Sequence, residues 1–240
     1  MLNYAKTDIG KVRKMNQDYY YINEDETLFI LADGMGGYTG GEVASKLATI
    51  AAEKYINEHF DKNKDYVKEE ILEIINNSIE FANREVYKKA HTNEELELMG
   101  TTIEICLIYK ERAYIGHVGD SRIYRIRKGI MRKLTKDHSY VQTLVEDGTI
   151  TKEEAEHHPK KNMLVKALGC EGNVNAEVMV RGFQKEDIIL ICSDGLTNMI
   201  PEKRIFEIIN NNVETAANEL IKEANANGGN DNITLIIIKN

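Results

Sequence analysis

Short apolar runs alternate with longer amphipathic stretches along this chain. A short run closed by turn residues is typical of a buried strand, and apolar residues at every third or fourth position are typical of a helix. On this basis we predict strands over residues 2–7, 19–22, 28–33, 103–109, 113–118, 123–126, 130–134, 176–183, 188–193 and 233–238. We predict helices over residues 43–59, 67–86, 201–210 and 216–224. The chain is therefore predicted to mix helices with strands.

The strands between residues 103 and 134 follow one another through short turns, which predicts a meander and a mainly antiparallel sheet. A more polar insert follows at about 137–168, with helical patterns at 141–146, 152–157 and 162–168. Polar inserts of this kind often cover functional sites, so we expect a flap here. The chain shows no repeat, low-complexity tract or linker, and 240 residues suffice for one sizeable core. We expect a single domain over 1–240.

Carboxylates recur beside glycines where the predicted strands begin or end. Asp33 follows an apolar run and precedes Gly34, and Asp194 stands in the same relation to Gly195. Two unrelated Asp-Gly turns would explain these two positions alone. Three further carboxylates in similar places, however, favour a common site; they are Asp18, Asp120 and Asp231.

Several carboxylates in one cleft repel each other and resist ionisation unless a cation holds them. Oxygen ligands without His or Cys spacing suit Mg²⁺ or Mn²⁺ rather than zinc. Two such ions generate a bound hydroxide near neutral pH. Arg13 precedes Asp18 by five residues and offers a bidentate fork for a phosphate, although a solvated loop charge is the commoner role of an arginine. The pattern indicates metal-assisted hydrolysis of a phosphate ester.

Charge and cysteine content narrow the setting of this chemistry. A net charge of -8 argues against nonspecific nucleic-acid binding. Cys106 and Cys192 lie in apolar runs, so we expect free buried thiols and a reducing compartment. The first residues lack the apolar core of a signal peptide, and no apolar stretch is long enough to span a bilayer. We therefore expect a cytoplasmic protein without a membrane partner, and tethering through another protein stays open.

Six motifs in order closely resemble the metal-dependent protein phosphatases of type 2C in their compact bacterial form. The motifs are Arg13-x-x-Asn16-Gln17-Asp18, Asp33-Gly34-Met35-Gly36-Gly37, Met99-Gly100-Thr101-Thr102, Val118-Gly119-Asp120-Ser121-Arg122, Ser193-Asp194-Gly195 and Gly229-Asn230-Asp231-Asn232. Each motif is weak alone, but together they cover essentially the whole chain. The resemblance implies an α+β fold, a four-layer α-β-β-α sandwich of two mainly antiparallel sheets flanked by helix pairs.

The resemblance also implies the activity and the role of each site residue. It implies hydrolysis of phosphoserine and phosphothreonine in proteins by a metal-activated water, without a phosphoenzyme, using two Mn²⁺ or Mg²⁺ ions and a weaker third. Asp33 would bridge the two ions, and Gly34 would offer its carbonyl oxygen to one. Asp194 and Asp231 would hold the second ion, and Asp120 with Asp194 would hold the third. Asp18 would order a metal-bound water, and Arg13 would bind the phosphate. The expected partners are phosphorylated proteins, a serine/threonine kinase and its substrates, and we expect a monomer.

Two departures from the family pattern leave the general acid open. Many bacterial relatives carry His directly after Gly-Gly, where this chain has Tyr38, and eukaryotic relatives often carry His in the place of Met35. Metal-bound water is our first candidate for the acid, and Tyr38 is a candidate for the substrate site. A catalytically weak, phosphoprotein-binding relative remains the alternative function. An aspartate-nucleophile phosphatase is disfavoured, because its second aspartate two residues after the first is missing at Met35.

Overall fold

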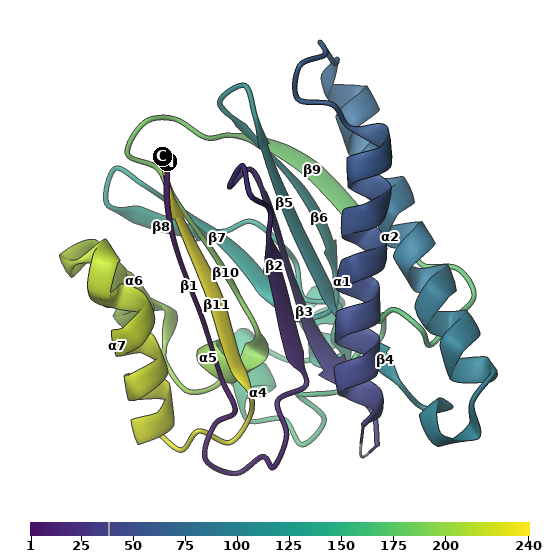
Figure 1. The fold of residues 1–240 in the computed structure, drawn as a ribbon. Helices are drawn as coiled ribbons and strands as arrows, with labels where there is room; N and C mark the ends of the chain where they lie inside the picture. The colour runs from purple at the N-terminus through teal and green to yellow at the C-terminus, as the bar shows by residue number, and fades with distance from the viewer. Residues whose placement is uncertain (38) are drawn as a thin grey trace.

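Two antiparallel sheets pack face to face, and a pair of helices covers the outer face of each (Figure 1). The structure is a computed structural model that describes residues 1–37 and 39–240. The five-stranded sheet has the order β1-β11-β10-β7-β8, over Leu2–Asp8, Ile233–Lys239, Ile188–Cys192, Arg122–Arg127 and Ile130–Lys133. The six-stranded sheet has the order β2-β3-β5-β6-β9, over Asp18–Ile22, Leu28–Met35, Ile103–Tyr109, Arg112–Val118 and Glu177–Gly182, with β4 (Gly100–Thr101) paired to β3.

The long helices lie outside the sheets, and the short segments lie in the connections between strands. The outer helices are α1 (Gly40–His59), α2 (Lys68–His91), α6 (Glu202–Asn211) and α7 (Val213–Ala226). The short segments are the 3-10 helix η1 (Glu94–Leu96), α3 (Tyr140–Glu146), α4 (Lys152–Glu156) and α5 (Asp194–Thr197). This arrangement confirms the predicted four-layer α-β-β-α sandwich. No helix among the described residues combines the length and the apolar character needed to cross a membrane.

Strand β3 shows why its sequence is apolar on both faces. Leu28 and Ile30 pack against α1 and α2, whereas Phe29 and Leu31 face the other sheet. All four side chains are buried, because alternate residues of a strand point to opposite faces and both faces are covered here. The strand therefore belongs to two cores at once, and its position in the molecule is fixed from both sides.

The predicted meander is wrong at one point. Strands β5 and β6 pair in one sheet and β7 and β8 in the other, so the chain crosses between the sheets after Val118. Gly119 makes the crossing with a φ of +120°, a conformation that side chains with a Cβ rarely adopt. The crossing places Asp120 at the end of the sandwich where both sheets are open.

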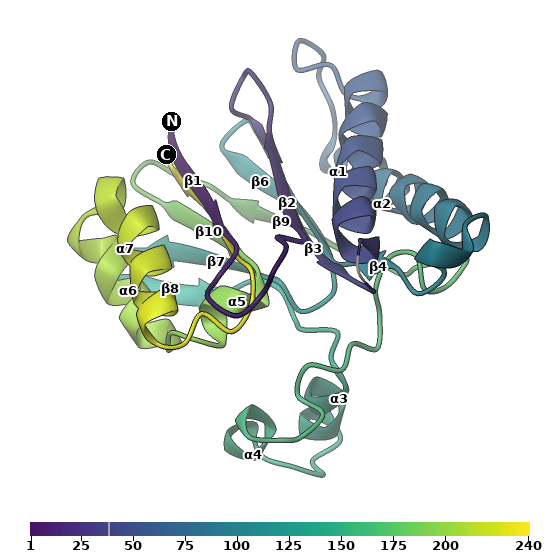
Figure 2. The same cartoon turned by 60° about the horizontal axis from the view of Figure 1, so that its bottom comes forward.

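The insert over residues 137–168 projects from the sandwich and carries α3 and α4 (Figure 2). Two of its three predicted helices are present. The third, over residues 162–168, is absent, because this segment is extended and forms single bridges from Leu164 to Ser139 and from Leu168 to Thr101. These long-range backbone hydrogen bonds replace the local ones of a helix.

Candidate metal centre

Five carboxylates from both sheets meet at one end of the sandwich, the lower end in Figure 1. Asp18 and Asp33, two members of the predicted common site, face each other across the β2–β3 pair. Asp33 is not at the end of its strand, because β3 continues to Met35 through pairing with β4. Asp194 begins α5 rather than ending a strand.

The two sheets are joined at this end through Ser193. Its hydroxyl donates to Oδ2 of Asp18 at 2.9 Å and accepts the Thr234 amide at 2.9 Å. Gly195, two residues after Ser193, lies very close to the backbone of Asn232. A Cβ at position 195 would be 2.0 Å from the Asn232 carbonyl oxygen. Only glycine permits this approach, which brings Asp194 and the loop carrying Asp231 together.

The carboxylates raise one another's pKa values because they are buried beside like charges. Burial, followed by repulsion from Asp18, Asp194, Asp120 and Asp231, raises the pKa of Asp33 well above its usual range. Burial raises the pKa of Asp18 to about 7 and, with the charge of Asp231, that of Asp194 to about 6. Burial and repulsion from Asp194 also raise the pKa of Asp120. The centre therefore favours any positive charge that enters it.

One oxygen of this centre has no partner. Oδ1 of Asp18 is buried and forms no hydrogen bond within residues 1–37 and 39–240. A buried acceptor without a donor is unfavourable unless a cation or an ordered water satisfies it. Oxygen donors alone line the centre, which is the donor set of Mg²⁺ and Mn²⁺. On both grounds the residues present fit a divalent metal site.

Arg13 lies beside this centre, on the loop after β1. Its Nη2 donates to Oδ2 of Asp231 at 2.7 Å, and about half of its side chain is exposed. This hydrogen bond and the charges of three nearby carboxylates raise the pKa of Arg13 further, despite partial burial. The loop is held by Gly10, where a Cβ would lie 2.2 Å from the Asp231 carbonyl oxygen. The guanidinium is thus placed near the carboxylates while remaining accessible.

A second buried group of ionisable side chains was missed by the sequence analysis. Glu104 and His117 are fully buried between the sheets, with 2.7 Å between Oε1 and Nδ1, and His117 Nε2 lies 2.7 Å from the Lys136 carbonyl oxygen. Burial raises the pKa of Glu104 to about 7, and the charge of Glu104 is among the contacts that raise that of His117 to about 9, against burial. The available signal was a single glutamate in an otherwise apolar strand.

Hydrogen bonds next to this second group join the crossing segment that carries Asp120 to the start of the flap. The His138 amide donates to the Gly119 carbonyl oxygen at 2.7 Å, and the Gly119 amide donates to His138 Nδ1 at 3.1 Å. Asp137 accepts hydrogen bonds from Arg122 at 2.7 to 3.1 Å. The root of the flap is therefore fixed to the segment that carries Asp120.

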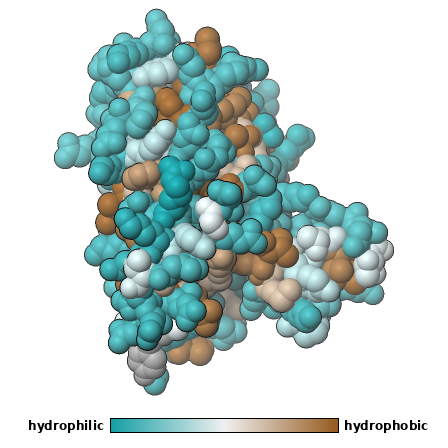
Figure 3. All heavy atoms as spheres, turned by 90° about the vertical axis from the view of Figure 1, so that its right-hand side faces the viewer, coloured by the Kyte–Doolittle hydropathy of each residue, from teal (hydrophilic) through white to brown (hydrophobic). Residues whose placement is uncertain are grey.

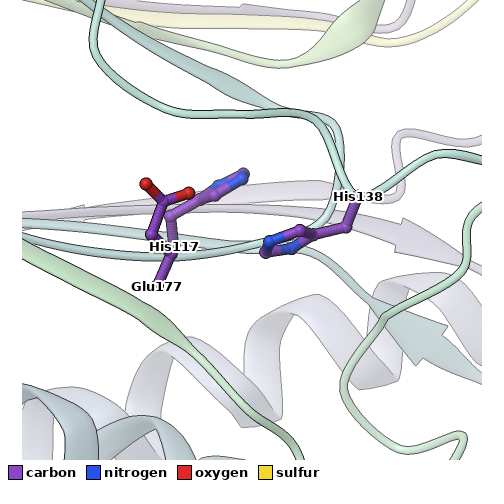
Figure 4. A group of neighbouring side chains, drawn as sticks. All are labelled: His117, His138 and Glu177. Carbon is purple, nitrogen blue, oxygen red and sulfur yellow. The ribbon is translucent and has the colours of Figure 1, made fainter. Parts of the chain in front are cut away.

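Figure 4 shows His117, His138 and Glu177 with ligand atoms within 4.8 Å of one another. The hydrogen bonds argue against a metal at this place. His117 Nε2 must carry a proton to bond a carbonyl oxygen, and its Nδ1 is engaged by Glu104. His138 Nδ1 accepts an amide, so a neutral His138 carries its proton on Nε2. In this arrangement both rings act as hydrogen-bonding groups.

The two residues that bear on the general acid have different outcomes. Met35 lies at the end of β3, close to Gly100, where a Cβ would be 2.7 Å from its Cε. Its thioether is no proton donor. Tyr38 lies outside the described residues.

Comparison with known proteins identifies the family. Residues 11–226 match the family model for protein phosphatase 2C. The chain belongs to the protein phosphatase 2C family. The serine/threonine phosphatase stp of Listeria innocua is 38% identical in an alignment 240 residues long, which covers 98% of this chain and 94% of that protein.

Solved structures of the family have the same fold as this protein phosphatase 2C. The serine/threonine phosphatase PstP/Ppp of Mycobacterium tuberculosis superimposes with a TM-score of 0.88 at 35% identity, covering 100% of this chain and 99% of that one. The catalytic domain of PstP in complex with two manganese ions gives a TM-score of 0.85 at 34% identity, covering 98% and 96%. The similarity therefore extends over nearly the whole length of this chain and of each of these solved structures.

Proposed function

We propose that the five carboxylates hold divalent cations with which this chain removes phosphate from phosphoserine and phosphothreonine in proteins. As a protein phosphatase 2C it is a metal-dependent serine/threonine phosphatase. The observation that carries the site assignment is the convergence of Asp18, Asp33, Asp194 and Asp231 around a buried oxygen that no hydrogen bond satisfies. The relative solved with two manganese ions supports Mn²⁺, or the chemically similar Mg²⁺, as the cation.

Each carboxylate has a proposed place in this centre. Asp33 would hold both cations, and the Gly34 carbonyl oxygen would be a further donor to one of them. Asp194 and Asp231 hold the other cation, and Asp120 with Asp194 holds a weaker third. When bound, the metals lower the pKa of a coordinated water and offset the charge of the phosphate.

The chain's own residues then orient the reactants. Asp18, held by the Ser193 hydroxyl, accepts a hydrogen bond from the attacking water and keeps it in line with phosphorus. Arg13 would release Asp231 when that carboxylate holds a cation, and its planar fork would then bind two phosphate oxygens. Its exposure makes this movement inexpensive.

The experiment is phosphate release from a phosphothreonine peptide with Mn²⁺ and with EDTA, for the wild type and Asp194→Ala. The matched control is Asp65→Asn, a highly exposed carboxylate on the connection between α1 and α2. We expect activity that requires metal, disappears in Asp194→Ala and persists in Asp65→Asn. Activity that ignores EDTA would refute the metal mechanism. Metal binding without turnover would favour the alternative, a phosphoprotein-binding relative.

We further propose a single catalytic domain over 1–240, monomeric and cytoplasmic, that acts on the substrates of a serine/threonine kinase and on the kinase itself. Light scattering after size exclusion tests the oligomeric state, and a mass near 27.3 kDa is expected. Incubation with an autophosphorylated serine/threonine kinase domain tests the partner class, since loss of its phosphate is expected only with metal.

A further inference from the structure

A hollow of about 290 Å³ lies between the end of the catalytic strand β3 and the segment that returns from the flap. Met35 forms one wall. The opposite wall comes from residues 164–167, 170–171 and 173–175. In Figure 3 apolar surface gathers where the flap, the projection on the right, leaves the body of the molecule. No step of the proposed mechanism uses this hollow.

The hollow adjoins the metal centre through β3. Residues two apart in a strand share a face, so Met35 lies on the same face of β3 as Asp33. Their separation along the strand is about 7 Å. A side chain two or three residues from a phosphoresidue held at Asp33 is therefore within reach of the hollow.

The far wall is built rather than incidental. Thr101 and Leu168 exchange two backbone hydrogen bonds of 3.1 and 2.8 Å, which ties the returning segment to the catalytic sheet. Asn83 of α2 accepts the Gly169 amide at 2.9 Å and donates to the Glu171 carbonyl oxygen at 3.0 Å. The wall keeps its place without a ligand, which reduces the entropy lost on binding.

The lining is apolar at Met35 and mixed on the flap side, where apolar side chains stand beside Lys166, Glu171, Asn173 and Asn175. Met35, Val165, Ala167 and Val174 line it, and Val165 keeps 44% of its surface exposed. Lys166 is a cation of the same wall. An exposed β-branched side chain beside a preformed hollow gains contact area if an apolar group enters.

We propose that this hollow is a specificity subsite, which takes an apolar side chain located within about three residues of the phosphoserine or phosphothreonine. The proposal rests on the proposed function of the acidic centre. The occupant is part of the substrate, because the hollow is lined by Met35, two residues along the strand that carries Asp33. Its volume admits a leucine-sized or somewhat larger side chain. Met35 adapts the wall to the occupant, since its thioether chain is flexible.

The test uses phosphothreonine peptides that carry alanine at three positions on either side, with leucine introduced at one position at a time. For the wild type with Mn²⁺, we expect leucine at one of the nearby positions to raise kcat/KM about tenfold, the effect of burying one apolar side chain. In Val165→Asp this preference should fall to about one. Ile130→Asp, which replaces an apolar residue on β8 that is exposed to a similar degree, should keep it.

Equal kcat/KM for all peptides in the wild type would overturn the subsite, as would a leucine preference that survives in Val165→Asp. Thermal unfolding checks that both variants fold, and Val165→Ser gives a milder second test in which the preference should fall partway. A small aryl phosphate has no flanking side chain and reports whether the wild-type centre is active. If it is hydrolysed with metal while the peptides show no preference, the subsite fails and the proposed function stands. If neither is hydrolysed, both fail.

Discussion

Two groups of ionisable side chains are buried in this protein, and His117 of one is three residues from Asp120 of the other. The two groups compensate the cost of burying charge in different ways. The metal centre gathers carboxylates of one sign around Asp33. The second group pairs Glu104 with Nδ1 of His117, and the other imidazole nitrogen of His117 donates a hydrogen bond to the Lys136 carbonyl oxygen. Like charges in a dry site repel, whereas an acid and a base share a proton. The first group therefore requires a cation from solution, and the second is balanced from within the chain.

The unpaired oxygens of the two groups sharpen this contrast. Oδ1 of Asp18 and Oε2 of Glu104 are both buried without a hydrogen bond in the described part of the chain. Glu104 has a buried imidazole against its other oxygen, and Asp18 has only a hydroxyl and further carboxylates nearby. A buried acid is thus a sign of a metal site only when the groups around it carry the same charge.

Removing one carboxylate of the metal centre should have the largest effect. We expect Asp33→Asn to lower kcat/KM for a phosphothreonine peptide by about 10³-fold, because it removes the proposed bridge between the cations. Without metal the same substitution should raise the melting temperature, since it removes a repelling charge. Activity within tenfold of the wild type in a peptide assay would contradict the role of Asp33.

Breaking the mixed group should act on stability. His117→Leu leaves Glu104 buried without a partner, and we expect the free energy of unfolding to fall by about 3 kcal/mol. Glu104→Leu combined with His117→Leu removes both charges and should restore much of that loss. Urea denaturation of both single variants and the double variant measures the coupling. A double variant as unstable as the sum of the single ones would show that the two residues do not depend on each other.

Substitution of Arg13 should separate phosphate binding from metal binding. We expect Arg13→Ala to lower kcat/KM about ten- to hundredfold, mainly through KM, because charge-assisted hydrogen bonds to the phosphate are lost. Arg13→Lys should recover only part, since an ammonium lacks the planar fork. Manganese affinity should not fall, as Arg13 competes for Asp231 when metal is absent. A weakened affinity for Mn²⁺ in Arg13→Ala would contradict this assignment.

The smallest effect concerns pH. The pKa values of about 7 for Asp18 and about 6 for Asp194 in the folded protein exceed the usual value for an aspartate. The folded state then binds more protons, so stability from these groups is present at low pH and is lost as pH rises through 6 to 7. Metal-free protein should therefore melt at a lower temperature at pH 8 than at pH 5, and Mn²⁺ should stabilise it more at pH 8.

Because Glu104 and His117 also have raised pKa values, they shift stability in the same direction. Asp194→Asn is the control that isolates the metal centre, and it should flatten the pH dependence of melting without metal. An unchanged profile in this variant would assign the effect to the mixed group instead.

The same contrast explains what the sequence could predict. The pairing of Asp18 with Asp33 is local, since one short turn joins β2 to β3 and both strands carry strong apolar patterns. Ordered motifs then pointed to Asp120, Asp194 and Asp231, and the structure brings these carboxylates around Asp33. The six motifs therefore predicted the four-layer fold and the clustering of these carboxylates.

What the sequence did not predict depends on contacts between distant segments. Glu104 and His117 are neighbours only because β5 pairs with β6. The sequence around Gly119 looks like an ordinary turn between neighbouring strands. In the structure β6 and β7, the strands on either side of it, belong to different sheets. Residues 162–168 resemble a helix locally, but bridges to Thr101 and Ser139 hold them extended. In each case tertiary contacts override the local pattern.

The most direct test of the comparison is calorimetric titration of metal-free protein with Mn²⁺ at pH 7.5. We predict binding of at least two ions by the wild type, loss of the tight sites in Asp33→Asn, and their retention in the double variant that replaces Glu104 and His117 with leucine. Unchanged binding in Asp33→Asn, or loss of binding in the leucine double variant, would contradict the claim that the like-charged group alone is built for metal.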